Sequence, residues 1–248
     1  RTVSNSISFS SLIFSFSKMK THMLCKITGA VKNTLVGVYG MHKAEFHSKF
    51  SDAHSFSKML VDLNLLLKPK LHIMDGIVAM EGQGPNAGDP VSMNVILLSD
   101  DPVALDTIFC KLINLDYKLV PTNVYGEELG LGSYEDIEVV GDDLKGLVNK
   151  DFRVDREKIK VKDSRLAKFS RNILKKPYII EEKCIKCGIC VKSCPLEDKA
   201  LTFAEGKDKP PVYDYNKCIR CFCCQEMCPE QAIDVKTPFL GRMVFYRR

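Results

Sequence analysis

No stretch of this 248-residue sequence reaches the roughly 18 apolar residues that a membrane-spanning helix requires. The sequence also lacks an initial methionine and begins with RTVSNSISFSSLIFSFSK, in which serines interrupt the apolar residues. A secretory signal peptide needs a continuous apolar core and a cleavage site, and this segment offers neither. We therefore expect no membrane span, a cytoplasmic location, and a chain that is either a fragment or processed at its N-terminus.

Motifs for binding nucleotides are also missing from the sequence. The Gly- and Pro-containing stretch EGQGPNAGDP, residues 81–90, has the spacing of neither a Walker loop nor the dinucleotide fingerprint. The basic run 158–177 contains no known nucleic-acid reader motif, so we expect a solvated segment or a protein-docking surface there and no nucleic-acid partner.

Cysteine, in contrast, is abundant. Eight of the 11 cysteines fall in two C-x2-C-x2-C-x3-C-P runs, KCIKCGICVKSCP at 183–195 and KCIRCFCCQEMCP at 217–229. Such short and regular spacing indicates metal binding in a reducing compartment rather than disulfides. A zinc site has no use for this run twice over, whereas the run is typical of iron–sulfur clusters.

Each run supplies three closely spaced thiolates, and a cubane cluster needs four. In two-cluster bacterial ferredoxins the fourth cysteine of each run serves the other cluster. The sequence therefore predicts two [4Fe-4S] clusters, one held by Cys184, Cys187, Cys190 and Cys228, the other by Cys218, Cys221, Cys224 and Cys194. Cys223 breaks the spacing and is predicted not to be a ligand, and Cys25 and Cys110 are predicted to be buried apolar residues.

Charge changes along the chain and indicates its domains. Residues 144–177 carry 12 basic and 4 acidic side chains, a net charge of +8, whereas 1–143 carry −5 and 178–248 carry +2. We expect an α/β layered domain at 1–143, N-terminally incomplete, then a basic connecting segment at 144–177. A small α+β ferredoxin-like domain is expected at 178–248.

Apolar patterns within the first domain alternate between strands and helices, which favours an α/β layer fold. Helices are expected at 51–69, 100–115 and 121–132, the second with Asp101 as N-cap and Pro102 as its first residue. We expect loops at 17–33 and 81–90, and strands at 12–16, 70–80, 91–99 and 137–141, of which those at 12–16 and 91–99 are expected to be buried.

A candidate ligand site consists of polar residues next to these strands. Cations and amides that converge at a strand end suit an anion, such as a phosphate or a carboxylate. The candidates are Lys20, His22, Lys32, Asn33, Asp75, Glu81 and Gly84. A solvated basic loop and glycines that serve only a tight turn remain the alternative. The five histidines, between positions 22 and 72, are expected to be structural, and Asp106 to favour only the dipole of its own helix.

Taken together, the stretches KMKTH, TGAVKN, HKAEFH, DGIVAMEGQGPNAGDP and SDDPVALD resemble the family called "domain of unknown function 362". Members of that family often end in a ferredoxin-like segment with two runs like those found here. The resemblance implies an iron–sulfur protein with an α/β domain, and it favours the seven candidate residues as a site. It supplies no established reaction.

Two functions follow from these observations. The first is single-electron transfer to or from a redox protein partner through the two clusters. The alternative is a redox enzyme whose α/β domain binds a small anionic substrate or cofactor and receives electrons from the clusters.

Overall fold

The computed structural model describes residues 12–38, 42–158, 175–204 and 206–239. The chain divides into two compact units. The first unit comprises residues 1–43 and 53–159, and the second comprises 44–52 and 160–248. None of the helices among the described residues combines the length and the apolar character that crossing a bilayer demands.

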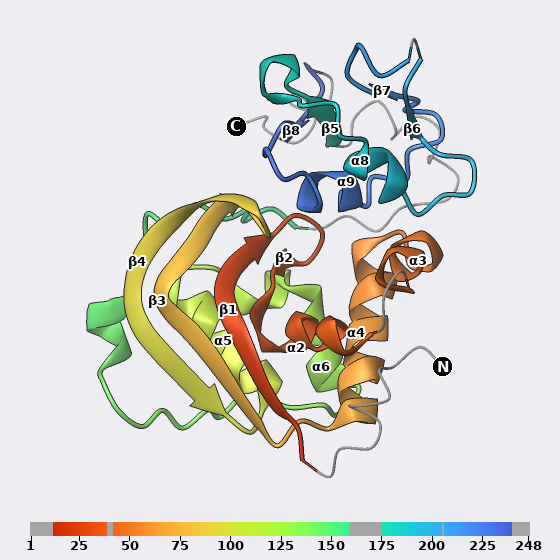
Figure 1. Cartoon of the computed structure of the whole chain (residues 1–248). Helices are drawn as coiled ribbons and strands as arrows, with labels where there is room; N and C mark the ends of the chain where they lie inside the picture. Colours follow the sequence, from red (N-terminus) through yellow and green to blue (C-terminus); the bar gives the residue numbers. More distant parts are fainter. Residues whose placement is uncertain (1–11, 39–41, 159–174, 205, 240–248) are drawn as a thin grey trace. The chain divides into compact units, whose positions relative to one another are not determined.

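The first unit is built on a four-stranded mixed sheet with strand order β2-β1-β3-β4 (Figure 1). Its strands are β1 (Phe14–His22), β2 (Lys26–Ile27), β3 (Leu71–Gln83) and β4 (Ala87–Ser99). Strand β1 runs parallel to β3, whereas β2 and β4 pair antiparallel with their neighbours. The expected α/β architecture is therefore present, with a mixed rather than a parallel sheet.

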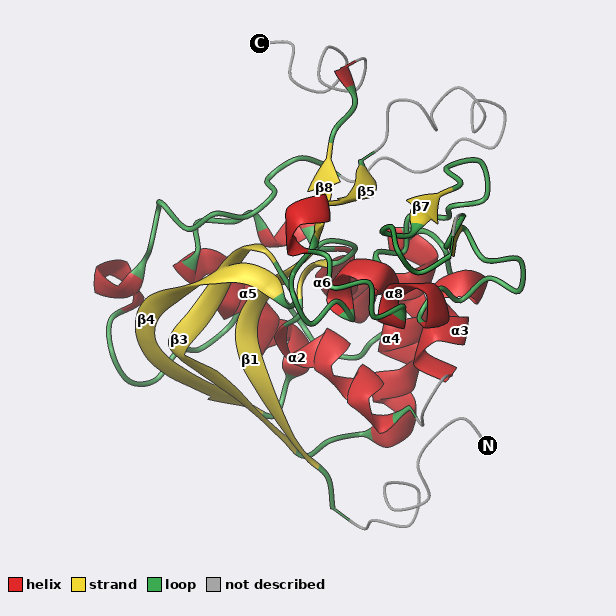
Figure 2. Ribbon diagram, turned by 45° about the horizontal axis from the view of Figure 1, so that its top comes forward, coloured by secondary structure: helices red, strands yellow, loops and turns green. Residues whose placement is uncertain are grey.

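Helices cover one face of this sheet (Figure 2). The core between the layers joins Met19 and Met74 of the sheet to Leu105 and Phe109, all of them buried. The helical elements of the first unit are α2 (Gly29–Asn33), η1 (Thr34–Gly37), α4 (Ala53–Leu67), α5 (Pro102–Leu112), η2 (Tyr117–Leu119), α6 (Pro121–Glu128) and η3 (Leu144–Leu147). Helix α3 (His42–Lys49) spans the division between the two units.

The opposite face of the sheet carries exposed apolar side chains. Phe16 is 69% exposed and Leu98 60% exposed, while their strand neighbours Ser17 and Met19 are buried. Alternate residues of a strand point to opposite faces, so only every second side chain meets the helices. The expectation of wholly buried strands at 12–16 and 91–99 was therefore wrong about burial, although both strands exist.

Three other expectations about local structure were wrong. The predicted loop 17–33 contains the end of β1, all of β2 and helix α2. The predicted loop 81–90 is largely a β-hairpin, in which Glu81 pairs with Asp89 and Gln83 with Ala87. The predicted strand 137–141 is irregular, and Val140 there is 88% exposed. A lone apolar run without a pairing partner does not make a strand.

Helices were predicted more accurately than strands. Helix α4 lies within the predicted range 51–69 and buries Phe56, Met59, Leu60 and Leu63. Helix α5 begins at Pro102, and the carboxylate of Asp101 accepts hydrogen bonds from the backbone amides of Val103 and Ala104 at 2.7 and 2.9 Å. Capping residues act locally, which makes helix starts readable from sequence.

The second unit is small and rich in short strands. Strand β5 (Lys176–Ile179) pairs with β8 (Ile233–Lys236), and β6 (Leu201–Thr202) pairs with β7 (Val212–Tyr213). Its other elements are η4 (Glu181–Lys183), α8 (Ile189–Lys192) and α9 (Cys223–Glu226).

The predicted basic segment 144–177 falls partly outside the described residues, which omit 159–174. Its first part packs on the first unit, where Phe152 is buried in the core and Arg153 pairs with Glu81. The predicted domain boundaries remain a prediction.

Candidate iron–sulfur centre

Two cavities in the second unit are lined by cysteines. The lining of the first cavity includes Cys184, Cys187, Cys190 and Cys228. The lining of the second cavity includes Cys194, Cys218, Cys221 and Cys224. Each cavity thus receives three cysteines from one run and the last cysteine of the other run.

Backbone conformation in each run turns three cysteines toward one point. Lys186 and Gly188 adopt positive φ angles of 58° and 76° before helix α8. Arg220 and Phe222, 34 positions later, adopt 59° and 62° before helix α9. Two left-handed residues within three positions coil the chain into a tight loop. A non-glycine residue in this region costs of the order of 1 kcal/mol, so Phe222 is held there by its surroundings.

Burial makes free thiolates unfavourable at these positions. It raises the pKa of Cys190 to about 11, and the neighbouring Cys187, Cys228 and Cys184 add to the rise. Burial likewise raises the pKa of Cys218 and of Cys224. A thiolate becomes stable in such a place when a metal replaces its proton. The two sets of four cysteines therefore fit iron ligation.

Hydrogen bonds to sulfur are present in both cavities. The hydroxyl of Tyr213 donates to Sγ of Cys224 at 3.2 Å, and the amide of Ala232 donates to Sγ of Cys228 at 3.3 Å. Burial, reinforced by the charge of Cys224, raises the pKa of Tyr213, so its hydroxyl keeps its proton. Such donors tune the electronic properties of metal-bound thiolates.

The cysteines do not form a site for a single metal ion. Within the described ranges, no three His, Cys, Asp or Glu side chains come together as ligands of one ion. Zinc needs four ligands at about 2.0–2.3 Å from one point. A [4Fe-4S] cluster instead takes its four thiolates around a group of several iron and sulfide ions.

Cys223 lies beside this arrangement and forms a hydrogen bond with the thiol of Cys221. That bond raises the pKa of Cys223 and lowers the pKa of Cys221. The lining described for both cavities omits Cys223.

Most of the candidate residues of the first unit contact other groups of that unit. Asp75 lies in the middle of β3, which corrects the expectation of a strand end, and its carboxylate pairs with Lys18 Nζ at 2.6 Å. Its pKa is lowered, first by the hydrogen bond from Lys18 and then by the backbone amide of Ile77. This pair faces solvent on the exposed side of the sheet.

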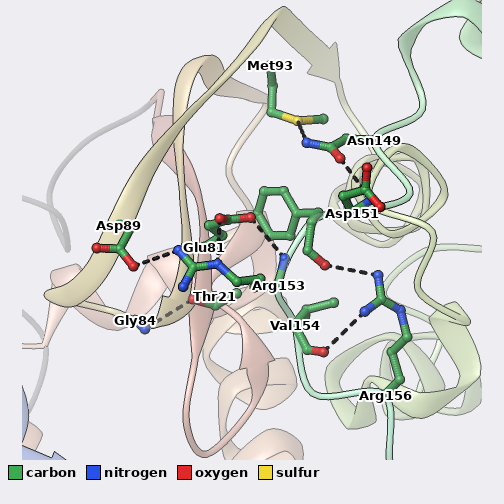
Figure 3. A network of polar contacts seen from close by, with 11 residues as sticks. Thr21, Glu81, Gly84, Asp89, Met93, Asn149, Asp151, Arg153, Val154 and Arg156 are labelled. Atoms are coloured by element: carbon green, nitrogen blue, oxygen red, sulfur yellow. Dashed lines mark hydrogen bonds and ion pairs between the residues drawn. The ribbon is translucent and has the colours of Figure 1, made fainter.

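Glu81 and Gly84 hold the β3–β4 hairpin in place (Figure 3). Glu81 accepts hydrogen bonds from the backbone amide and Nε of Arg153 at 2.9 and 2.7 Å, and Arg153 also pairs with Asp89 at 2.6 Å. The amide of Gly84 donates to the Thr21 hydroxyl at 3.1 Å. A Cβ at position 84 would overlap the carbonyl of Thr21, which explains the glycine.

Asn33 and His22 also hold backbone segments together. The Asn33 amide donates to Ser15 Oγ and to the carbonyl of Phe16, fixing the end of α2 beside β1. His22 is buried, and its Nδ1 accepts from the amides of Leu24 and Cys25 at 3.1 and 3.2 Å. The two remaining candidates lie apart in the chain, Lys20 in β1 and Lys32 in α2. The contacts described for the candidates join groups of the first unit to one another and leave the predicted anion site a prediction.

Asp106 has a role that the sequence did not reveal. Its fully buried carboxylate accepts from the amides of Ala30 and Val31 at 2.5 and 3.1 Å and thereby caps helix α2. Burial raises its pKa to about 7, against the lowering effect of those two amides. Sequence position had related Asp106 only to its own helix, because the capped helix lies 76 residues away.

Comparison with known proteins finds two family models that match separate parts of the chain. Residues 2–111 match the family described as "Domain of unknown function (DUF362)", and residues 176–229 match a "4Fe-4S dicluster domain". The chain is 37% identical over 121 residues to "Thylakoid-associated protein sll1697" of Synechocystis sp. (strain ATCC 27184 / PCC 6803 / Kazusa). That match spans 48% of this chain and only 38% of the relative. No solved structure matches the chain. Residues similar to the DUF362 family thus precede residues similar to a 4Fe-4S dicluster domain, which confirms the predicted resemblance.

Proposed function

We propose that this protein transfers single electrons through two [4Fe-4S] clusters held in a ferredoxin-like second unit. The observation that carries the proposal is the pair of cavities, each lined by four cysteines of which the fourth comes from the other run. Such crossing is what two-cluster ferredoxins use to place two centres close together. The dicluster match at 176–229 supports an iron–sulfur electron-transfer role.

The protein's own residues supply the ligands and the environment. When bound, a [4Fe-4S] cluster takes up and releases one electron at a time. Around the cysteines, apolar side chains exclude water and so influence the potential. They are Ile179, Ile185 and Ile233 at the first cavity, and Leu201, Ile219 and Phe222 at the second.

A redox protein is the partner that this function requires. At the first cavity Cys187 is exposed and Ile185 is 60% exposed, so this cavity reaches the surface. We infer that electrons are exchanged with the partner there, since electron transfer needs close approach. The thiolate ligands call for a reducing compartment, which agrees with the predicted cytoplasmic location. The relative's name records association with thylakoids, so a membrane-bound partner is a second source of electrons to test.

The enzyme alternative rests on the seven candidate residues of the first unit. Asn33, Asp75, Glu81 and Gly84 bind other groups of the same unit through the contacts described above. These contacts favour a structural role, so electron transfer stands as the proposed function.

The test compares cysteine variants of the full chain after anaerobic reconstitution. The wild-type chain should bind about eight iron and eight sulfide ions, the content of two [4Fe-4S] clusters. Cys194→Ser should lose the cluster of the second cavity, and Cys228→Ser should lose the cluster of the first. Each variant should therefore bind about half of the wild-type iron. Cys223→Ser is the matched control and should keep the full content.

Iron and sulfide analysis with low-temperature EPR after reduction checks these values. A wild-type chain with no reducible cluster would refute the function. Full iron in both Cys194→Ser and Cys228→Ser would instead refute the assignment of these two cysteines as ligands.

A further inference from the structure

The two cysteine runs are related by a shift of 34 positions, which pairs each residue of one cavity with a counterpart in the other. Cys190 corresponds to Cys224, and Ile179 corresponds to Tyr213. Ile179 lines the first cavity and Tyr213 lines the second. The repeat is therefore chemically unequal at this position: one cavity has a hydrocarbon side chain where the other has a phenol.

The phenol is directed at a predicted ligand. Tyr213 Oη lies 3.2 Å from Sγ of Cys224 and donates its proton to that sulfur. The bond is long for an oxygen acceptor but normal for sulfur, which is larger. At the equivalent place in the first cavity, the side chain of Ile179 has no proton to donate to Cys190.

Neighbouring aromatic groups fix the Tyr213 ring. It stacks on Tyr215 with ring centroids 5.5 Å apart and an interplanar angle of 12°. Tyr215 is itself anchored, because its hydroxyl donates to the carbonyl of Pro177 at 2.8 Å and Lys176 Nζ lies 4.3 Å from its ring centroid. The Tyr213 hydroxyl is thus held in position before any electron arrives.

We propose that Tyr213, through its hydrogen bond to Cys224, makes the second cavity the preferred site of the electron. This inference rests on the proposed function. A one-electron reductant adds one negative charge to the ligand set and its cluster, and no bond forms or breaks. A donor to a thiolate stabilises the more negative form, so it raises the reduction potential of the second site.

The first cavity has backbone donors of its own, the amide of Ala232 on Cys228 at 3.3 Å and the amide of Val191 on Cys190. A phenol, with an ordinary pKa of about 10, is much more acidic than a backbone amide and makes the stronger bond to a thiolate. The difference between the cavities therefore favours the second. Since the first cavity carries the exposed Cys187, electrons would enter there and move inward to the second. Tyr213 acts through Cys224 and is a positioning residue.

The experiment is a redox titration of the anaerobically reconstituted full chain with dithionite, followed by EPR. Tyr213→Phe keeps the ring and its stacking but removes the hydroxyl. We expect the second site to hold its electron about tenfold less favourably, which is about 59 mV for a one-electron couple. Tyr178→Phe is the matched control, because its hydroxyl donates to the Asp234 carboxylate and not to a sulfur, and its titration should equal that of the wild type.

The outcomes separate this inference from the proposed function. A wild-type chain that binds fewer than two clusters overturns both. A Tyr213→Phe chain with full iron and an unchanged titration overturns only the role of Tyr213. Should Tyr213→Phe fail to assemble, a chain with fluorotyrosine at position 213, a more acidic donor, must shift the second potential upward, and no shift would refute the inference.

Discussion

The two units of the molecule differ in what surrounds their buried ionisable groups. In the first unit the buried carboxylate of Asp106 is matched by two backbone amides, so the protein itself satisfies it. In the second unit buried thiols such as Cys190 and Cys224 face cavities, and burial raises their pKa as it raises that of Asp106. A buried group that protein atoms satisfy stabilises a fold. Thiols gathered around a cavity are available for a metal.

Iron removal should give the largest difference between the units. Because metal binding and folding are coupled in small metal domains, chelation should unfold the second unit and leave the first unit folded. The second unit offers only two two-stranded sheets and a small apolar cluster in its described part. Amide hydrogen exchange with mass spectrometry, before and after anaerobic chelation, measures both units in one sample.

Protection lost throughout both units would contradict this expectation, as would protection kept in peptides of 176–229. The Cys223→Ser chain provides the control, because its iron should be removed at the wild-type rate. It would show whether the neighbouring thiol influences release.

Asp106 should give the next largest effect, confined to the first unit. The pKa of the Asp106 carboxyl is about 7 in the folded chain, compared with an ordinary value of 3.8. The folded chain therefore binds the carboxyl proton more tightly than the unfolded chain does. The free energy of unfolding should therefore fall as pH rises from about 4 to about 7, by about 1.4 kcal/mol for each unit of pKa difference.

Asp106→Asn should remove this pH dependence and cost about 1–3 kcal/mol at low pH, since its amide group would face a backbone N–H. Urea unfolding monitored by circular dichroism between pH 5 and 7.5 measures both. Asp116→Asn is the control, because Asp116 caps only the exposed amide of Lys118. An equal slope in Asp106→Asn would show that another group titrates.

The predictability of the two units differs for the same physical reason. The cysteine runs place three ligands within seven residues, so their chemistry is visible in the sequence. The contacts of the first unit join distant positions: Asp106 with Ala30, Arg153 with Glu81, and Gly84 with Thr21. No local pattern encodes such pairs, and polar residues that serve them resemble a binding site.

The end of strand β1 was predicted wrongly for a similar reason. Residues 17–22 contain a single apolar side chain, Met19, and their polar members suggested a loop. Pairing with β3 up to Lys20, and with β2 at Thr21 and His22, nevertheless extends the strand to His22. Lys18 and Asp75 face each other in that pairing. Helix starts were predicted well because caps such as Asp101 act within four residues.

The smallest effect on stability is expected from the exposed ion pair of Lys18 and Asp75. Lys18 and Asp75 have side chains 44% and 49% exposed, and an ion pair in such a place contributes at most about 1 kcal/mol and is screened by salt. Lys18→Ala should therefore change the free energy of unfolding of the first unit by less than this, and by still less in high salt. Asp75→Asn should behave alike and leave the iron content and both reduction potentials unchanged. If Asp75→Asn alone altered a reduction potential, Asp75 would belong to a site that influences the clusters. The assignment of a purely structural role to Asp75 would then be wrong.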